Sequence, residues 1–534
     1  MLMDAKSFSS ETRQNADVCI IGAGVAGITL ALELDKKGIS SILLDGGDES
    51  FSMESQSLYS PGDKIEGYED ITYNRLRFLG GSSNHWQNST GLFTKEDFEK
   101  RDWIPNSGWP ITHEDIAPHY VLAGHYCGTG TDGYDTQYWL NKMGGVDPTK
   151  GSNALELGIN KAAIPPTRFY YVHGAKIVDS EHINLIKNAN LVDLEFDENT
   201  QLVNEITFVT YNSQSRHKVT AKQFILCCGG IENARFMLLF NEKYQNKIGN
   251  QYDNIGRYFM EHPVLRAANF YPSKNTKLDI LNEGILEEGR MIKGFMQIDG
   301  ETLTRNKAIN LRLPLHRKTK YEISEGIRSY HYLTDSSKAD GFPNDGWSHI
   351  YNIIADLDMF AEAIARKKFS TELFEHAKEF GGYEISMMFE QIPDRNNRIT
   401  LSEDRDVLGI KKVNVQWQLL KKDKENVWTA LELIAKELGK SNLGKLHILD
   451  EYEEQVFGNK MFFSHHHMGT TRMADSPNNG VVDKNLKVFG TQNLFIGGSS
   501  IFSTSSHVPP TLTISAFSVR LAEHLAQIKG LVND

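Results

Sequence analysis

The sequence predicts a mixed α/β fold that opens with a βαβ unit, and three observations lead to this prediction. Residues 18–21 form an apolar run before a glycine turn, 28–34 have helical spacing, and 41–44 are again apolar. Alternating segments over 191–209 predict a β-meander, and 222–228 predict a further buried strand. Residues 426–438 have helical spacing within a less regular second half, where 341–345 have the composition of a loop.

The size and composition of the chain indicate a packed protein of two domains. It has 534 residues, of which 40% are hydrophobic and 24% charged, close to ordinary globular usage. A formal net charge of -12 argues against binding to nucleic acid or to an anionic lipid surface. Four cysteines are too few for a disulfide framework, and no apolar stretch before Val18 has the length of a signal peptide or a membrane span. We therefore expect a cytoplasmic protein with no nucleic-acid partner and no membrane span.

The first motif with chemical meaning is the glycine turn between the first strand and the first helix. The segment GAGVAG places Gly22, Gly24 and Gly27 at the start of that helix. Glycine allows a tight turn and a close approach of the backbone to a pyrophosphate, which free N–H groups at the helix N-terminus then bind. Asp45 ends the second strand, where a carboxylate accepts hydrogen bonds from a ribose. The arrangement predicts a dinucleotide site, and these residues do not distinguish FAD from NAD.

A second glycine-rich segment, GGSSNHW, begins at Gly80. Its glycines give backbone freedom, and its side chains offer hydrogen-bond donors and an aromatic plane, which suit contact with a second part of an extended cofactor. A glycine turn followed by a buried tryptophan explains the same residues equally well.

Five motifs, taken together and in order, make the chain similar to one known family. They are GAGVAG, GGSSNHW, CCGGIENAR at 227–235, NIGRYFMEHP at 254–263, and HHMGTTRM with the later GVVDKNLKVFGTQNLFIGGSSIF. They resemble the glucose-methanol-choline (GMC) oxidoreductases, within them the bacterial branch related to pyranose oxidases and to sugar or aminoglycoside alcohol oxidases. The resemblance extends from residue 17 to about residue 524.

The resemblance implies a Rossmann-like FAD-binding domain with an antiparallel-sheet substrate-binding domain over the flavin ring. It assigns 14–95, 190–263 and 462–532 to the FAD-binding domain, and 96–189 and 264–461 to the substrate-binding domain and connecting segments. In some pyranose oxidases the matching histidine is linked covalently to the flavin, so His85 is a candidate attachment point. The residues expected to bind FAD are Gly22, Gly24, Ala26, Gly27, Asp45, Gly80, Gly81, Ser82, Asn84, His85, Trp86, Cys228, Gly498, Ser499, Pro510 and Thr511.

Three consecutive histidines, His465, His466 and His467, precede the GT pair near the C-terminus. Neighbouring side chains point in different directions in a strand or a helix, so this spacing does not favour a metal site, and we expect no metal. A neutral imidazole can remove the hydroxyl proton of an alcohol while a hydride leaves its carbon. By resemblance, the family's catalytic histidine lies three residues before the glycine of the GT pair, which is His466. We interpret His465 as a core histidine bonded to the backbone.

The second catalytic position departs from the family pattern. Relatives carry His or Asn within N-P-T-L-T before the last helix, whereas this chain has SSHVPPTLT, with Pro509 at the usual Asn position. Proline offers no side-chain donor. His507 could replace it, or could be only a supporting loop residue. The helix expected over 511–525 would point its N-terminus at the pyrimidine end of the flavin.

The function expected from these residues is oxidation of an alcohol group of a sugar, glycoside or similar polyol, with FAD as cofactor and His466 as base. The electron acceptor stays open between oxygen and a quinone or redox protein. A non-oxidative FAD-dependent lyase on the same scaffold is the alternative, because the usual Asn is absent.

Overall fold

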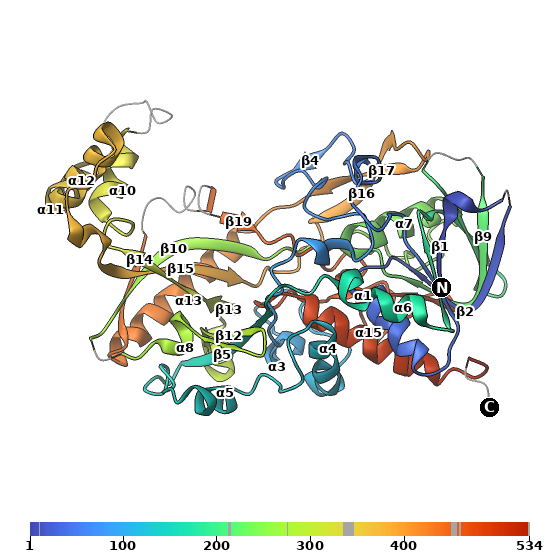
Figure 1. Cartoon of the computed structure of the whole chain (residues 1–534), viewed down its shortest axis with the longest axis horizontal. Helices are drawn as coiled ribbons and strands as arrows, with labels where there is room; N and C mark the ends of the chain where they lie inside the picture. The colour runs from blue at the N-terminus through green and yellow to red at the C-terminus, as the bar shows by residue number, and fades with distance from the viewer. Residues whose placement is uncertain are drawn as a thin grey trace.

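The computed structural model of the chain describes residues 1–9, 11–211, 215–274, 276–334, 346–449, 457–458 and 461–531. Two large sheets lie side by side along its longest axis (Figure 1). The predicted loop at 341–345 lies outside the described residues. Every helix in the described part of the chain is too short or too polar to span a bilayer.

The first sheet has eight strands and contains the predicted βαβ unit. Five neighbouring strands and one added strand run parallel, and three strands at one edge form the antiparallel meander. In spatial order the strands are β1 (Leu2–Asp4), β6 (Ile183–Lys187), β3 (Ser41–Leu44), β2 (Arg13–Ile21), β9 (His217–Leu226), β8 (Leu202–Val209) and β7 (Asn190–Asp197), with β20 (Leu494–Ile496) paired to β9. The predicted strands at 18–21 and 41–44 and the meander at 191–209 are confirmed.

Strands β1 and β6 pair within this sheet, although the predicted FAD-binding stretches 14–95, 190–263 and 462–532 do not contain them. Both are short, and an apolar run of this length carries little periodicity to reveal its partner. The division of the whole chain into domains remains a prediction.

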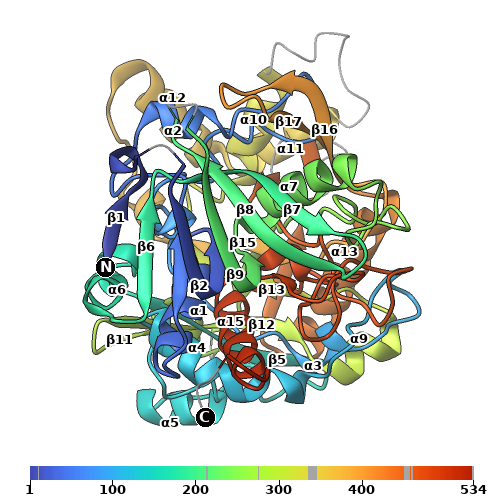
Figure 2. The same ribbon diagram turned by 90° about the vertical axis from the view of Figure 1, so that its right-hand side faces the viewer.

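Helices cover the first sheet on the side of α1 (Val25–Asp35) (Figure 2). This helix is buried on every side over residues 26–34, and Ile28, Leu30 and Leu34 have no exposed surface, because it lies between the sheet and other helices. It packs against α15 (Thr511–Ala526) and α6 (Phe169–Asp179), and α15 also packs against α4 (Tyr120–Tyr126). The helices expected over 28–34 and 511–525 are therefore confirmed.

The second sheet has nine strands, and all of its pairings are antiparallel. Helix α13 (Lys421–Lys440), which contains the predicted helical stretch 426–438, packs beside β18 and buries Val427, Leu431 and Ile434. The strands are β11 (Ile285–Glu287), β12 (Arg290–Ile298), β13 (Leu311–Leu313), β15 (Phe380–Phe389), β10 (Pro263–Pro272) and β18 (Gly444–Ile448), with β5 (Leu155–Ala163), β14 (Leu315–Thr319) and β19 (Met461–Phe463) added at its sides.

Smaller elements complete the described fold. A three-stranded sheet consists of β16 (Arg398–Arg405), β17 (Lys411–Gln416) and β4 (Ile65–Glu66). Helices α10 (Glu325–Thr334), α11 (Gly346–Ala355) and α12 (Leu357–Phe369) project at the end of the second sheet that is farther from the first (Figure 1). The remaining helices include α2 (Met53–Ser57), α3 (Lys95–Phe98), α5 (Thr136–Met143), α7 (Gly229–Lys243), α8 (Asp279–Asn282) and α9 (Gly300–Asn306).

Candidate functional site

A cavity of about 1030 Å³ lies where the carboxyl ends of the parallel strands meet one face of the second sheet. Ile21, Leu44 and Cys227, at the ends of β2, β3 and β9, line it on the first side, and Lys293 and Met388 line it on the other. Ligands of open α/β sheets bind at this edge, and the volume lies at the upper end of the range for ligand pockets.

The glycine turn after β2 has the geometry that its sequence predicts. Gly22 has φ of +109°, and a Cβ at this position would lie 2.5 Å from the carbonyl oxygen of Cys227. A Cβ on Gly27 would lie 1.9 Å from the carbonyl oxygen of Gly22, so this glycine permits close packing of helix on turn and does not line the cavity. A Cβ on Gly24 would meet no protein atom within 4 Å, and Gly24 lines the cavity. The space beside Gly24 is therefore open to a ligand at the N-terminus of α1.

Asp45 lines the same part of the cavity with its carboxylate held in place. Its Oδ2 accepts from the backbone N–H of Ala23, and its Oδ1 accepts from that of Gly47, both at 2.8 Å. Each carboxylate oxygen keeps a further lone pair, so the group can still accept from a ribose hydroxyl.

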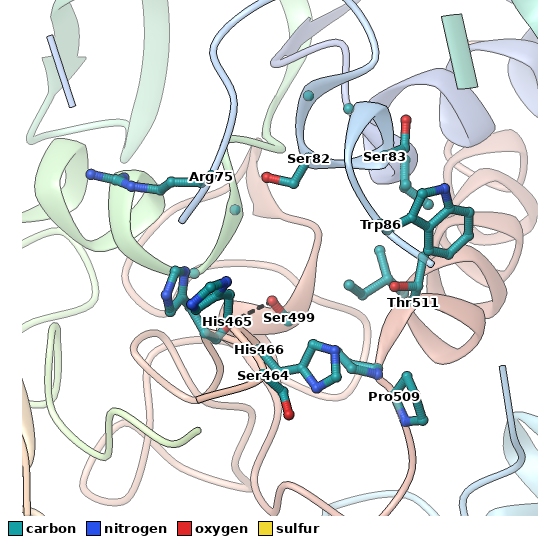
Figure 3. Close-up of a pocket in the computed structure, with 18 of the residues that line it drawn as sticks. Arg75, Ser82, Ser83, Trp86, Ser464, His465, His466, Ser499, Pro509 and Thr511 are labelled. Carbon is teal, nitrogen blue, oxygen red and sulfur yellow. Dashed lines mark hydrogen bonds between the residues drawn. The ribbon is translucent and has the colours of Figure 1, made fainter. Parts of the chain in front are cut away.

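The GGSSNHW loop is anchored by residues that do not line the cavity. Gly80 donates its N–H to the Ala23 carbonyl at 2.9 Å, which ties this loop to the glycine turn. The amide of Asn84 donates to the carbonyls of Leu79 and Gly81, so Asn84 supports the loop from behind. Gly81, Ser82, Ser83, His85 and Trp86 line the cavity. Figure 3 labels Ser82, Ser83 and Trp86 among them.

The other residues expected at the cofactor come from three separate elements. Ala26 lies on α1, Cys228 precedes α7, Gly498, Ser499 and Pro510 lie between β20 and α15, and Thr511 begins α15. All six line the cavity, and Figure 3 places Ser499 and Thr511 around one space with His466. Arg75 and Arg77 line it as well; sequence reasoning gave them no role, although they stand only a few residues before the GGSSNHW loop.

His466 lines the cavity, and the hydrogen bonds behind it determine which of its nitrogens carries the proton. The Nε2 of His262 lies 2.8 Å from the carbonyl oxygen of Ser505, which can only accept, so this nitrogen is the donor. The Nδ1 of a neutral His262 is then an acceptor, and it lies 2.9 Å from the Nδ1 of His466. His466 therefore carries its proton on Nδ1 and its lone pair on Nε2. Among the described residues none bonds to that Nε2.

Burial keeps both imidazoles neutral. It lowers the pKa of His262 to about 4, and it lowers the pKa of His466 well below its ordinary value of 6.5, with further contributions from His262 and the charge of Arg312. A neutral His466 with a free Nε2 is a proton acceptor at physiological pH.

Glu261 fixes the backbone on both sides of the histidine pair. Its Oε1 accepts from the backbone N–H groups of His262 and His466, each at 2.7 Å, and its Oε2 accepts from the hydroxyl of Tyr68. Burial raises the pKa of Glu261 to about 7. Sequence reasoning quoted both Glu261 and His262 within the segment NIGRYFMEHP but gave neither a role, because strand β10 begins one residue later and only folding brings this segment to residue 466.

The neighbouring histidines have different surroundings. The expectation of a core residue for His465 is wrong: its side chain is 39% exposed, lines the cavity and pairs through Nε2 with the carboxylate of Glu69 at 2.5 Å. His467 is buried, with Nε2 at 3.2 Å from the Tyr68 hydroxyl.

The structure does not bring His507 to the cavity. Its side chain is fully buried and does not line the cavity, and its Nε2 lies 2.8 Å from Oε1 of Gln297, which engages this nitrogen. Pro509, two residues later, lines the cavity instead (Figure 3). Of the two roles that the sequence left open for His507, the structure favours the supporting loop residue, and the cavity wall at the family's Asn position has no donor.

Comparison with known proteins adds independent information. The family model of the FAD binding domain matches residues 17–257, and that of the GMC oxidoreductases matches residues 393–518. The large subunit of fructose dehydrogenase from Gluconobacter japonicus is 24% identical to this chain, over 96% of it and 98% of the relative. A 2-methyl-1,2-propanediol dehydrogenase from Mycolicibacterium austroafricanum is 21% identical over 96% and 95%.

Solved structures share the fold. Pyridoxine 4-oxidase from Mesorbium loti superposes with a TM-score of 0.53 at 14% identity, covering 96% of this chain and 99% of that one. Formate oxidase gives a TM-score of 0.53 at 16% identity, covering 98% and 100%.

Proposed function

The chain belongs to the GMC oxidoreductase family and uses FAD, and on this premise we propose that it oxidises an alcohol group of a sugar, glycoside or similar polyol. The similarity to proteins named for fructose and for a propanediol supports an alcohol as the donor.

The residues of the cavity fit an FAD molecule. The space beside Gly24 at the N-terminus of α1 suits the pyrophosphate, since a side chain there would meet no protein atom. Asp45 suits the adenosine ribose, and the loop that contains Ser82 and Trp86 extends the same cavity toward His466. When bound, FAD supplies the two-electron acceptor that takes the hydride from the alcohol carbon.

The single observation that carries the proposal is the free Nε2 of a neutral His466 on the cavity wall. The hydroxyl proton of the substrate passes to this nitrogen while the hydride leaves the carbon, and the alcohol becomes a carbonyl. His262 keeps the His466 proton on Nδ1 throughout, and Glu261 fixes the backbone of both residues. The wall at Pro509 offers no donor to the substrate oxygen, so His466 is the proposed site of proton transfer.

Anaerobic reduction of the purified holoenzyme tests the proposal. A panel of sugars and polyols should bleach the visible flavin band with at least one member. The variant His466→Ala should keep its yellow colour and reduce about 10²- to 10⁴-fold more slowly, which is the usual contribution of a general base. His376→Ala is the matched control, because it removes a partly exposed histidine that pairs with Asp358 outside the cavity lining. Normal reduction by His466→Ala would refute the base, and failure of every alcohol to bleach the wild type would favour the non-oxidative lyase.

Two further measurements define the cofactor and the acceptor. Absorbance before and after acid precipitation tells whether flavin stays attached, and His85, which lines the cavity, is the attachment point to replace if it does. Oxygen uptake, compared with reduction of a quinone or redox dye, identifies where the electrons go next.

A further inference from the structure

One face of the second sheet forms the cavity wall opposite the first sheet, and period-two alternation determines which residues it presents. Along β13 and β14, Leu311, Leu313 and Leu315 are buried in the core of the second sheet. Arg312 alternates with them and lines the cavity. It stands opposite Gln297 on β12 and Met388 on β15, so it lies at the centre of this face.

Arg312 is a buried cation whose charge no carboxylate of the described residues balances. The residue is 9% exposed, its Nη1 donates to Oδ1 of Asn160 at 3.2 Å, and its Nε has no acceptor. Burial lowers the pKa of Arg312 to about 10, which still leaves it charged at neutral pH. An unpaired buried charge is strongly unfavourable, so a counter-charge is expected from a molecule that enters the cavity.

The other charged side chains on the second-sheet wall of the cavity are also positive. Lys293 lines it, donates to the Leu315 carbonyl at 3.4 Å and forms no ion pair within the described ranges. Arg266 lines it as well, at 3.5 Å from the carboxylate of Glu384. The carboxylates that line the described cavity, Asp45 and Glu232, belong to the first-sheet side.

The positive wall is close to the reacting end of the cavity. The charge of Arg312 contributes to the lowered pKa of both His466 and His262, whereas Gly24 and α1 lie on the first-sheet side. The counter-charge that Arg312 lacks is therefore expected on the molecule that His466 acts upon.

We propose that the substrate carries an oxyanion, a carboxylate or a phosphate group, which Arg312 binds while His466 takes the hydroxyl proton. This proposal rests on the proposed alcohol oxidation and narrows its substrate to an acidic sugar or polyol. Arg312 thus selects the substrate, and the charge of Lys293 adds to the attraction of this wall for anions.

Matched pairs of compounds test the proposal on the holoenzyme. D-glucose is compared with D-glucuronate and with D-glucose 6-phosphate, and D-sorbitol with D-gluconate, by the rate of anaerobic flavin reduction at low concentration. The acidic member of a pair should react at least tenfold faster, and the carboxylate and phosphate arms tell which oxyanion is used. In Arg312→Gln the rate of flavin reduction by the acidic substrate should fall about 10- to 100-fold, while the rate with the neutral substrate should change by less than about threefold.

Two further variants and two ligands that cannot be oxidised complete the test. Arg312→Lys should retain part of the preference, and Arg317→Gln, which removes an exposed arginine outside the cavity lining, should retain all of it. Glutarate and inorganic phosphate have no alcohol to oxidise, so their effect on the flavin band measures oxyanion binding alone, and Arg312→Gln should weaken it about tenfold or more.

Equal rates for neutral and acidic members, or an equal loss with both in Arg312→Gln, would overturn the proposal and leave alcohol oxidation standing. If no member of any pair bleached the flavin, alcohol oxidation would fail, and the glutarate and phosphate titrations would still decide whether Arg312 binds an oxyanion.

Discussion

Replacing His262 by leucine tests how strongly one hydrogen bond controls the proposed base. In the wild type the Nδ1–H of His466 has a partner at 2.9 Å, the fully buried ring of His262. Leucine leaves this N–H unsatisfied, which costs about 1–3 kcal/mol, and the proton can then move to Nε2, where it blocks the base. At 1.4 kcal/mol per factor of ten, flavin reduction should slow about 5- to 150-fold.

The assay separates positioning from structure. Stopped-flow reduction under anaerobic conditions gives the rate, and the flavin spectrum and melting temperature report on cofactor content and folding. His262→Asn is the matched variant, because its Oδ1 can occupy the position of the histidine Nδ1 and accept from His466; it should recover most of the rate that leucine loses. A rate of flavin reduction in His262→Leu within twofold of the wild-type rate, at full FAD content, would show that this hydrogen bond does not control His466.

The remaining predictions concern the cofactor, the base and the buried acid. Gly24→Val should fold normally yet purify with little FAD, because its side chain meets only the ligand space; full occupancy would contradict this. The acid limb of the reduction rate should lie below pH 6.5, since the pKa of His466 is lowered and the base stays neutral until the pH falls further; a limb at or above 6.5 would count against His466. The raised pKa of Glu261, about 7, means that its contribution to stability is present below the unfolded pKa of about 4.5 and is lost as the pH rises through 7. Glu261→Gln should therefore raise the melting temperature, relative to wild type, more at pH 8 than at pH 5. An equal change at both pH values would contradict a raised pKa of Glu261.

The local elements near the N-terminus could be predicted because their signals are local. The strand, glycine turn and helix over 18–34 need only a few residues to specify them, and the contacts of Gly22 and Gly27 follow directly from their missing side chains. The meander at 191–209 could be predicted as well, because apolar and polar residues alternate along its strands and short turns join them. Strand β6 was missed because its partner β3 lies far away in the chain.

Among the site residues, the sequence identified His466 by resemblance and placed the glycine turn by its own pattern, while the partner of that histidine required the structure. His262 lies 204 residues earlier in the chain, and no spacing in the sequence connects the two rings. The role of His507 also required the structure. The sequence places this histidine near the family's second catalytic position, but it does not show that Gln297, 210 residues earlier, contacts its Nε2.

By itself, the sequence determined the βαβ unit with its glycine turn, since both depend on residues that are neighbours in the chain, and it indicated the family through the order of five short motifs. Only the tertiary structure decided which nitrogen of His466 is free and that Arg312 stands uncompensated on the opposite wall. Hydrogen-bond partners and unbalanced charges are properties of side chains that folding brings together across two sheets, so they have no local signature to find.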